Sequence, residues 1–561
     1  MTDILAGHLL VSCLIDLGVD LSFGVPGESY LAVLDGLYAR RDRIRFVSCR
    51  HEGGAAFMAE AYGKLTGKPG VCLVTRGPGA SNAAIGVHTA FQDSTPLLLL
   101  VGDVGGSMRE REAFQEVDFA AMFGPSTKGM AKRVERIDDP ARIPEALRRA
   151  YATAVNGRPG PVVLVLPEDM LTRRVAVPPP LPPVVAAHPG CDAAAGRQLE
   201  QLLRAAQRPL VLAGGAFSPA GARALERFAA AWQVPVANAF RFQDTFDNWH
   251  PQYAGDVGIA INPQLARRIG EADLLLALGP RLGEMTTSGY TLLQVPRPRQ
   301  RLVHVHPDAT ELERVYQAEL ALCAAPDAVA SLLAGLAPPA EPAWQSWTRQ
   351  CCADYLANLQ GPLPPAGALD MREVVAVVQR LLPADAVLSN GAGNFANWLH
   401  RFFRYRGLSA GLKTQLAPTS GAMGYGVPAG IAANLASGRT SLTFTGDGDF
   451  LMTSQELATA TLHGARSIIV LVNNGGYGTI RMHQERRYPG RLSGTDLANP
   501  DFCALARAYG WGARRIEATA DFEPALRQAL QHERGTLLEL MLPMEQISTR
   551  QTLQQMQGSR S

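Results

Sequence analysis

The chain has 561 residues, of which 47% are hydrophobic and 19% charged, and its formal net charge at pH 7 is +2. This composition is typical of a globular protein, and a near-neutral charge without a basic run excludes nucleic acid as an expected partner. No apolar stretch reaches the roughly 18 residues of a membrane-spanning helix, so we expect no membrane partner. The eight cysteines lack metal-like spacing, and we therefore expect reduced thiols and a cytoplasmic protein.

Two proline-rich stretches punctuate the chain. The first is "VAVPPPLPPVVAAHPG" at 175–190, and a second connector is bracketed by prolines at 336–344 and 361–367. Proline at this density excludes helix and central strand, so extended linkers are the natural interpretation. The sequence therefore predicts three domains, at 1–174, 190–335 and 368–545, followed by a polar tail at 546–561.

Short apolar runs alternate with helical patterns in each predicted domain. The first 20 residues predict an amphipathic helix and not a signal peptide, because no Lys or Arg precedes the apolar part. Continuous apolar strands that alternate with helices are typical of buried parallel sheet. The predicted fold class is α/β, with three consecutive doubly wound parallel-sheet domains. The predicted strands are 45–49, 70–75 and 96–103, then 208–215, 272–279 and 301–307, then 386–391, 441–448 and 467–474, with helices at 53–67 and 81–92 in the first domain.

The stretch from Leu442 to Gly478 carries the most informative pattern. One apolar run breaks into Gly-Asp-Gly at 446–448, and the next breaks into Asn-Asn-Gly-Gly at 473–476. Between them, Thr453 and Glu456 have the spacing of a capping box, which predicts a helix start, and the glycine after His463 predicts its end.

Parallel strands that follow one another end at the same edge of a sheet, so Asp447 and Asn474 are expected to lie together. A carboxylate, an amide oxygen and free carbonyls are the hard ligands that Mg²⁺ prefers, usually beside phosphate groups. Glycines allow the backbone to approach a phosphate closely. Two glycine-rich turns without a ligand are the alternative, but the complete order of strand, helix and strand favours a Mg²⁺–diphosphate site. The glycines concerned are Gly446, Gly448, Gly475 and Gly476.

This order resembles the signature of the thiamine-diphosphate-dependent enzymes. The segment "SCRHEGGAAFMAEAYGKLTG" resembles the activating-glutamate segment of that family, with Glu52 in the place of the glutamate, and 75–103 resembles the family's next segment. "AFQEVD" at 113–118 and "GAMGYGVPAGIAA" at 421–433 resemble the acetolactate-synthase branch in particular. The resemblance extends in the right order from Thr2 to about Leu553.

The resemblance implies a pyrimidine-binding first domain, a central domain and a diphosphate-binding third domain, with thiamine diphosphate and Mg²⁺ as cofactors. It implies that Asp447, the Asn474 side chain and the Gly476 carbonyl hold Mg²⁺ on the diphosphate. Met423 would hold the two cofactor rings in a bent conformation, and Gly421 would offer a carbonyl to the 4′-amino group. Asn394 would contact the diphosphate.

Several residues are expected to act on the reaction itself. Glu52 would make the aminopyrimidine a base by favouring its imino tautomer. Gln115 would donate a hydrogen bond to a substrate or intermediate oxygen, and Phe114 would pack against substrate. Lys128 is either an anion contact or a solvated lysine. His483 stands where the acetolactate branch places a pocket-shaping tryptophan.

The sequence also departs from that branch at the acceptor side of the site. In "GPRLGEMTTSG" Arg281 is present, but Gly283-Glu284-Met285 lacks the second arginine thought to hold the acceptor carboxylate. Three arginines of a polar loop either replace it or are solvated: Arg481, Arg486 and Arg487. FAD is possible in the central domain but doubtful, because "LAGGAFSPAG" is a weak glycine-rich match and "HVHPD" replaces the usual acidic turn.

The function implied is that of a thiamine-diphosphate- and Mg²⁺-dependent 2-keto acid decarboxylase and carboligase, which forms an enamine and adds it to a second carbonyl. A decarboxylase or C–C lyase that does not ligate remains the alternative. A non-catalytic homologue is disfavoured because Glu52, Asp447 and Asn474 are all present, and no convincing GxGxxG segment supports a nicotinamide dehydrogenase. A homodimer or homotetramer is implied, with each site between the first domain of one chain and the third of another.

Overall fold

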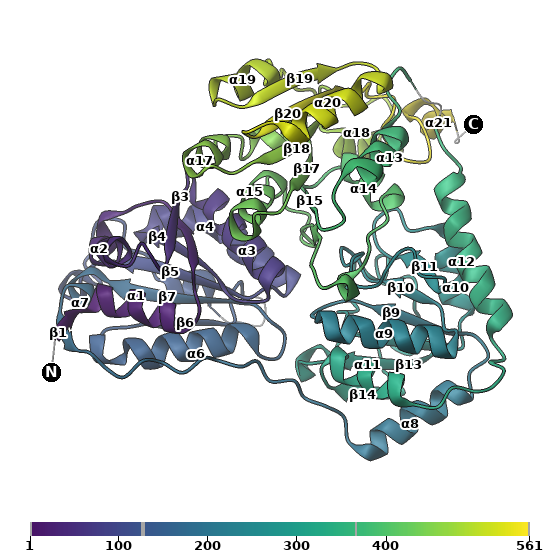
Figure 1. Cartoon of the computed structure of the whole chain (residues 1–561), viewed down its shortest axis with the longest axis horizontal. Helices are drawn as coiled ribbons and strands as arrows, with labels where there is room; N and C mark the ends of the chain where they lie inside the picture. Colours follow the sequence, from purple (N-terminus) through teal and green to yellow (C-terminus); the bar gives the residue numbers. More distant parts are fainter. Residues whose placement is uncertain (1–2, 125–128, 365–366, 559–561) are drawn as a thin grey trace.

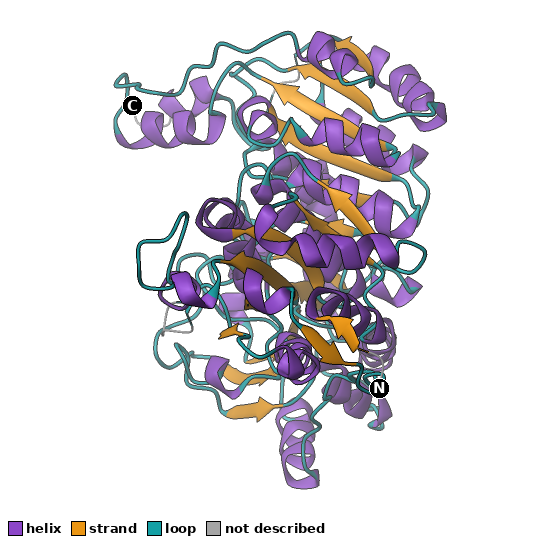
Figure 2. Ribbon diagram, turned by 90° about the vertical axis from the view of Figure 1, so that its left-hand side faces the viewer, coloured by secondary structure: helices purple, strands orange, loops and turns teal. Residues whose placement is uncertain are grey.

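The computed structural model describes residues 3–124, 129–364 and 367–558. Three six-stranded sheets organise this part of the chain, and every neighbouring pair of strands within them is parallel. Helices lie against the sheets, as Figure 2 shows. The predicted α/β class with three parallel-sheet domains is therefore confirmed. Each sheet falls within one predicted domain, while the boundary residues themselves stay predictions (Figure 1).

The first sheet has the strand order β3-β2-β4-β5-β7-β6, and its second, third and fourth members are almost entirely buried. The apolar runs predicted at 45–49, 70–75 and 96–103 form β3, β4 and β5. The strands are β2 (Leu21–Gly24), β3 (Arg45–Ser48), β4 (Gly70–Thr75), β5 (Leu97–Asp103), β6 (Arg133–Arg136) and β7 (Pro161–Pro167). The helices are α1 (Ala6–Asp16), α2 (Leu31–Ala39), α3 (Glu52–Thr66), α4 (Arg76–Asp93), α5 (Phe119–Phe123), α6 (Ile143–Val155) and α7 (Glu168–Leu171).

The expected amphipathic helix at the start is α1, which buries its leucines and leaves His8, Ser12 and Asp16 only partly buried. A small antiparallel ribbon, β1 (Asp3–Leu5) with β8 (Arg174–Ala176), closes the region. Between β8 and α8 (Ala193–Arg204) the chain has no helix or strand, which agrees with the predicted proline-rich linker. Among the described residues, no helix combines the length and apolar character that crossing a membrane requires.

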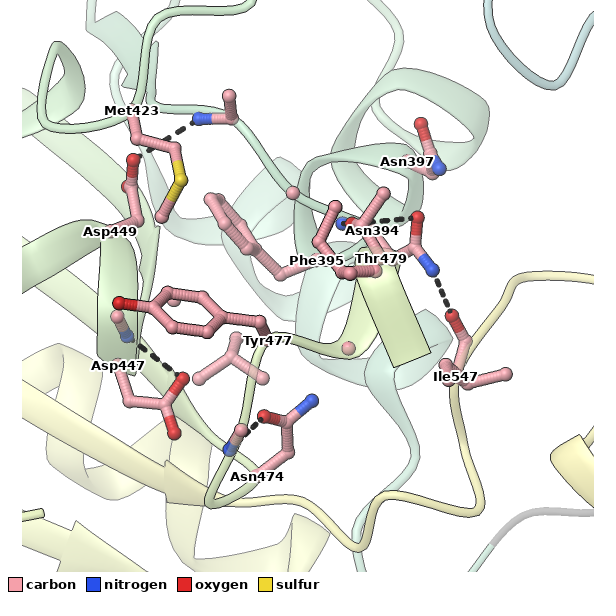
Figure 3. A pocket seen from close by; sticks show the side chains of 18 of the residues that line it. Asn394, Phe395, Asn397, Met423, Asp447, Asp449, Asn474, Tyr477, Thr479 and Ile547 are labelled. Atoms are coloured by element: carbon pink, nitrogen blue, oxygen red, sulfur yellow. Dashed lines mark hydrogen bonds between the residues drawn. The ribbon is translucent and has the colours of Figure 1, made fainter. Parts of the chain in front are cut away.

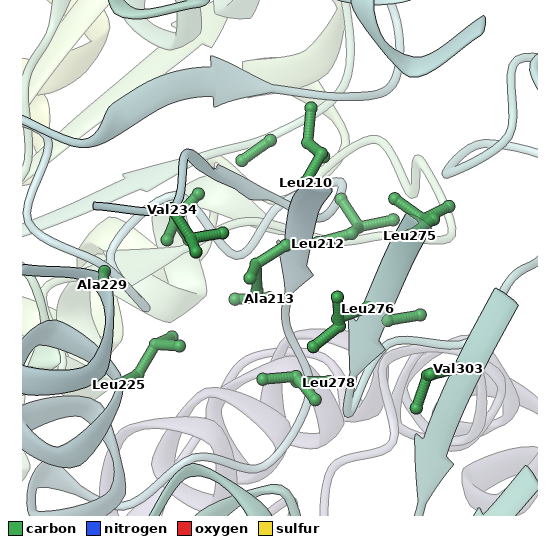
Figure 4. Packing of buried hydrophobic residues seen from close by; sticks show 14 of the residues in the cluster. Leu210, Leu212, Ala213, Leu225, Ala229, Val234, Leu275, Leu276, Leu278 and Val303 are labelled. Carbon is green, nitrogen blue, oxygen red and sulfur yellow. The ribbon is translucent and has the colours of Figure 1, made fainter. Parts of the chain in front are cut away.

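The central sheet has the order β11-β10-β9-β12-β13-β14 and a continuous aliphatic core, part of which Figure 4 shows. Leu210, Leu212, Leu276 and Leu278 alternate along two neighbouring strands and are almost completely buried. The strands are β9 (Pro209–Ala213), β10 (Val236–Asn238), β11 (Tyr253–Asp256), β12 (Leu274–Leu278), β13 (Arg301–His306) and β14 (Leu320–Cys323). The further helices are α9 (Pro219–Trp232), α10 (Pro263–Glu271), α11 (Pro326–Gly335) and α12 (Gln345–Gln360).

The third sheet has the order β16-β15-β17-β18-β20-β19. Its three predicted strands are confirmed as β15, β17 and β18. The strands are β15 (Val387–Asn390), β16 (Gln415–Leu416), β17 (Ser441–Gly446), β18 (Ser467–Asn473), β19 (Gly512–Ile516) and β20 (Thr536–Met541). The helices are α13 (Met371–Leu381), α14 (Phe395–Phe402), α15 (Gly426–Ser437), α16 (Asp447–Leu451), α17 (Glu456–His463), α18 (Gly478–Arg487), α19 (Phe502–Ala508), α20 (Phe522–Gln531) and α21 (Leu553–Gly558).

The first and third sheets share one hydrophobic core, because α3 packs against α15. The rings of Phe57 and Tyr425 meet edge to face with centroids 5.5 Å apart. The Tyr425 hydroxyl donates to the buried carboxylate of Glu60 at 2.6 Å, and Lys64 pairs with Glu60 and Asp93. A buried ion pair with additional hydrogen bonds resists separation, because removing one partner leaves an unpaired charge. This packing fixes how the two sheets of one chain face each other.

Candidate active site

A cavity of about 330 Å³ opens where β15, β17 and β18 end. The Gly-Asp-Gly turn follows β17, Asn474 follows β18, and 391–395 follow β15, so three carboxyl ends supply one wall (Figure 3). The expectation that Asp447 and Asn474 arrive together is confirmed, since both line the cavity. Arg241 and Ile259 follow β10 and β11 and bring the carboxyl edge of the central sheet to the same cavity.

Asp447 is held by backbone and side-chain donors and is 3% exposed. Its Oδ2 accepts from the Gly475 amide and from Asn499 Nδ2, both at 2.8 Å, and its Oδ1 accepts from the Gly448 amide at 3.0 Å. Asn474 Oδ1 accepts from the Gly476 amide at 3.2 Å. These contacts fix oxygen atoms in place, which is what a hard divalent cation requires of its ligands.

Two helix N-termini point at the cavity without a capping side chain. Ala392 to Phe395 lead into α14, and Gly478, Thr479 and Ile480 open α18. Neither helix has an acidic residue in its first turn or a side-chain cap. At α14 the Asn394 amide donates to Thr479 Oγ1 at 3.0 Å, whereas the Thr479 and Ile480 amides that open α18 have no partner among the described residues. Such free amides and the positive end of the helix dipole together form a phosphate-binding arrangement. The residues present therefore fit a diphosphate with a bound cation.

The glycines of the two turns differ in their roles. Gly446 and Gly448 line the cavity, and a Cβ on Gly448 would lie 2.5 Å from the Tyr477 ring. Gly475 is not among the residues that line the cavity. It has a φ of +71°, which favours glycine, and it turns its amide toward Asp447.

Gly421 and Met423 line the cavity from the loop before α15. This loop is held by Asp449, whose Oδ1 accepts from the Gly424 amide at 2.8 Å and the Ala392 amide at 3.2 Å. Burial raises the pKa of Asp449 to about 6, against the hydrogen bonds that it accepts. Sequence reasoning missed Asp449, although it stands two positions after Asp447 in the same motif.

Asn394 contacts the C-terminal segment and α18 across the mouth of the cavity. Its Nδ2 donates to the Ile547 carbonyl at 2.9 Å, and its Oδ1 accepts from Thr479 at 3.1 Å (Figure 3). Ile547 and Gln546 themselves line the cavity. The predicted polar tail thus contributes to the wall. Its apolar members pack on α18, namely Ile547, Leu553 and Met556 against Met482.

The expected helix between the two turns exists as α17, and Gly464 ends it in the left-handed conformation. The capping box itself is wrong, however. The helix begins at Glu456 without a side-chain cap, and Thr453 donates to the Gly424 carbonyl at 2.7 Å. Glu456 Oε1 accepts from the His51 amide at 3.0 Å, and its Oε2 accepts from the Arg50 amide at 3.3 Å. Both side chains therefore bond to backbone groups outside α17 and do not cap its first turn.

Glu52 begins α3 and is partly buried. Its Oε2 accepts from Asn82 Nδ2 at 2.8 Å. Glu52 does not line the cavity of its own chain. Glu456 at the start of α17 accepts from the amides of the two residues just before Glu52, so α17 of the third domain positions the segment that carries Glu52.

The remaining predicted residues lie outside the cavity. Phe114 is 70% exposed, and Gln115 is partly buried at a φ of +65°, with its carbonyl accepting from the Gly77 amide at 3.0 Å. His483 lies exposed on α18 and does not line the cavity. Lys128 lies outside the described residues.

Asn499 is a residue that sequence reasoning missed. Its Nδ2 donates to Asp447 Oδ2 at 2.8 Å and to Asn473 Oδ1 at 2.9 Å. Asn473 in turn donates to the fully buried Glu539 at 2.8 Å. This chain of polar groups supports Asp447 from behind, and its members lie too far apart in sequence for a pattern to indicate it.

Comparison with known proteins gives consistent matches along the chain. Residues 5–122 match the thiamine pyrophosphate enzyme N-terminal TPP binding domain, 197–333 match the central domain, and 391–540 match the C-terminal TPP binding domain. The acetolactate synthase large subunit of Corynebacterium glutamicum is 32% identical over 546 residues, which cover 93% of this chain and 84% of that protein. The acetolactate synthase isozyme 3 large subunit of Escherichia coli is 31% identical, with coverage of 95% and 93%.

Proposed function

Because this chain belongs to the thiamine-diphosphate-dependent enzymes and is similar to acetolactate synthase large subunits over most of its length, we propose that it is a carboligase, which decarboxylates a 2-keto acid and joins the remaining acyl group to a second carbonyl compound. The observation that carries this proposal is the meeting of Asp447, Asn474 and two uncapped helix N-termini at one cavity. A cytoplasmic location stays a prediction.

We propose that thiamine diphosphate binds in this cavity with Mg²⁺. Asp447, the Asn474 side chain and the Gly476 carbonyl would hold the metal, and the amides that open α18 would hold the diphosphate, with Asn394 beside them. Gly421 and Met423 would contact the cofactor rings. When bound, thiamine diphosphate supplies the carbanion that adds to a keto acid and takes up the electron pair left by CO₂.

Glu52 is proposed to hold and move a proton at the cofactor pyrimidine of a second copy of the chain. In its own chain Glu52 is not among the residues that line this cavity. A homodimer or homotetramer, with the first domain of one copy over the third of another, would bring Glu52 to the site. The exposure of Phe114 supports the same arrangement, because a large apolar side chain that is 70% exposed favours a contact surface.

Gln115 is proposed to donate a hydrogen bond to a substrate oxygen from that second copy, beside Phe114. His483 is proposed to take the position of the pocket-shaping residue, and its exposed place on α18 suits a contact with substrate only once a second copy covers it. These roles depend on assembly, which a mixing experiment can test.

A decarboxylase or lyase that does not ligate is the second candidate. The observation that favours it is the engagement of Arg281, whose Nη1 donates to the Gln92 carbonyl at 3.1 Å while its Nε lies 3.3 Å from Glu311. An arginine with these partners is not free to bind the carboxylate of an acceptor substrate. FAD in the central domain is proposed only as a possibility to be measured, by the absorption spectrum of the purified protein.

The test is NMR of the products from pyruvate with thiamine diphosphate and Mg²⁺, beside a Glu52→Gln control. Acetolactate or acetoin that disappears in the control is the expected result. If acetaldehyde is the single product, the protein is a decarboxylase and the carboligase proposal is wrong. If pyruvate does not react, a panel of 2-keto acids, 2-hydroxy ketones and cyclic diketones identifies the donor, and failure of the whole panel would overturn the proposal.

A further inference from the structure

Arg241 is a buried cation without a partner in the wall of the cavity. It follows β10, its side chain is 7% exposed, and its backbone has a φ of +65°. Within the described ranges it makes no hydrogen bond and no ion pair, and its Nε and Nη1 are buried and unsatisfied. Its guanidinium carbon lies 4.9 Å from the centre of the Phe240 ring, which packs against it but does not accept its protons.

The other buried arginines of the described residues all have an acidic partner. Arg76 pairs with Glu168 at 2.7 Å, Arg158 with Glu311 at 2.9 Å, and Arg268 with Asp354 at 2.8 Å. A buried charge left unpaired is costly, and a guanidinium with free donors is built to bind a carboxylate or phosphate in a fork. The unpaired state of Arg241 therefore points to an anion that completes it.

The surroundings of Arg241 do not compensate its charge. Asp256 and Asp93 attract it only from beyond ion-pair distance. Burial lowers the pKa of Arg241 to about 10, so the side chain is still charged at neutral pH. Among the described residues that line the cavity, Arg241 alone is cationic, and the same wall includes the apolar Ile259 and Trp398.

Resting on the proposed function, we propose that Arg241 binds the carboxylate of the acceptor, which is therefore a 2-keto acid. The donor loses its carboxylate as CO₂, and a fixed buried cation would stabilise the charged ground state against that loss. The acceptor keeps its carboxylate in the product, so the same cation stabilises it throughout. Two of the other candidate arginines already have acidic partners, since Arg281 contacts Glu311, and Arg481 lies near Glu485 at 3.4 Å and near Asp496 at 3.6 Å.

The first test measures binding with the unreactive keto acid analogue oxamate, by calorimetry on protein loaded with thiamine diphosphate and Mg²⁺. Arg241→Met should weaken oxamate binding by roughly 10- to 100-fold, the range for a lost hydrogen bond to a charged group, and Arg241→Lys should retain part of it. Arg268→Met is the matched control, because it removes a buried arginine of the same domain, on α10 and outside the cavity. Equal affinity of wild type and Arg241→Met, or no binding by either, would overturn the proposal.

The second test separates acceptor from donor, with pyruvate as donor and either 2-oxobutanoate or propanal as acceptor. The two acceptors share a carbon frame and differ in the carboxylate. Arg241→Met should lower the rate with 2-oxobutanoate at least 10-fold and leave the rate with propanal within about twofold. Equal losses would assign Arg241 to the donor and overturn the acceptor role. If the protein binds oxamate through Arg241 and yet joins no pair of substrates, that result would support the anion site and overturn the proposed function.

A dinucleotide phosphate offers the same anionic chemistry as a carboxylate. Equilibrium dialysis with FAD distinguishes the two sources. Undiminished oxamate affinity in Arg241→Met, together with lost FAD binding, would move Arg241 to a flavin site and overturn the acceptor assignment. Unchanged FAD behaviour, with weakened oxamate binding, is the expected result.

Discussion

The carboxyl edge of the third sheet and the segment around Glu52 carry the two groups of proposed active-site residues, the two halves of the site. They differ in how many partners hold their carboxylates and in how much of their surface is exposed. At the third sheet, Asp447 has three donors and is almost fully buried. In the first domain, the Glu52 carboxylate accepts from the Asn82 side chain, and Phe114 is 70% exposed. One half is assembled within a single chain, whereas the other is presented at its surface.

This difference supports the proposal that folding of one chain builds the cofactor pocket and that assembly of two copies completes the catalytic site. The shared core of α3 and α15 holds the two halves of one chain together but does not bring Glu52 into its own cavity. If this division holds, variants of the two halves should differ in how they respond to assembly, and mixing them should have the largest effect.

Two inactive variants should restore each other when they assemble. Glu52→Gln and Asp447→Asn each should lower activity by roughly 100-fold or more, because general acid–base groups and metal ligands contribute at that scale. Coexpressed in equal amounts, they should recover about a quarter of wild-type activity, since half the dimers of a random mixture are mixed and one of their two sites is intact. Product formation by the purified mixture checks this.

Recovery near zero in mixed dimers that mass spectrometry verifies would place both residues in the same chain. The matched control coexpresses Asp447→Asn with Asn474→Ala, which damage the same half and should not restore each other.

Removal of the support behind Asp447 should weaken metal binding. Asn499→Ala takes away one of the donors to Asp447 Oδ2 and should lower Mg²⁺ affinity by roughly 10- to 100-fold, as is usual for groups that orient a metal ligand. Titration of Mg²⁺ in the presence of thiamine diphosphate measures it. Asn434→Ala is the control, since the Asn434 side chain donates to the Arg439 carbonyl and accepts from the Arg466 amide, away from Asp447. Equal Mg²⁺ affinity in the two variants would contradict the role of Asn499.

The hydrogen bonds from the Arg50 and His51 amides to Glu456 of α17 should stabilise the folded chain. Glu456→Gln places an amide group opposite the Arg50 amide and should lower the free energy of unfolding by about 1–3 kcal/mol. Urea denaturation measures this loss, and hydrogen exchange should rise at residues 50–52. Glu523→Gln, on the surface, should change the free energy by less than about 1 kcal/mol. If hydrogen exchange at residues 50–52 is the same in Glu456→Gln and wild type, Glu456 does not hold this segment in place.

The last prediction concerns pH and the stability of the central domain. Burial raises the pKa of Asp256 to about 7, from about 3.9 in an unfolded chain. The stability that this group supplies is present below about pH 4 and lost as the pH rises through about 7. Asp256→Asn cannot ionise, so its free energy of unfolding should exceed that of wild type at pH 8 by up to about 4 kcal/mol, because each pKa unit corresponds to about 1.4 kcal/mol, and should nearly match it at pH 4. Thermal unfolding at both values checks it, and the opposite sign would refute the cause given.

The sequence was informative where local pattern and tertiary structure agree. The strands around Asp447 and Asn474 are continuous apolar runs, and parallel topology then brings their ends together without further information. The capping box failed for a physical reason, because Thr453 and Glu456 found partners in other elements. No pattern could have indicated these partners, since Glu456 and the His51 amide are 405 positions apart.

The residues that sequence reasoning missed share this dependence on distant contacts. Asn499 lies 52 positions after Asp447 and carries no motif. Arg241 stands in "NAFRFQD", where an arginine beside two phenylalanines reads as surface or stacking. Its significance comes only from burial without a partner, which no sequence pattern encodes. His483 shows the converse. The resemblance predicts which position it takes in the family's pattern, but not that its side chain is exposed on α18.

The unpaired guanidinium of Arg241 also has a consequence for the lifetime of the protein in a cell. A ligand that binds only the folded chain stabilises it, by about 2.7 kcal/mol when its concentration is 100 times its dissociation constant. Since small changes in stability alter how much protein escapes proteolysis, an anion that neutralises Arg241 would slow degradation. The amount of enzyme would then follow the supply of the compound that the enzyme consumes, without any regulator of its synthesis.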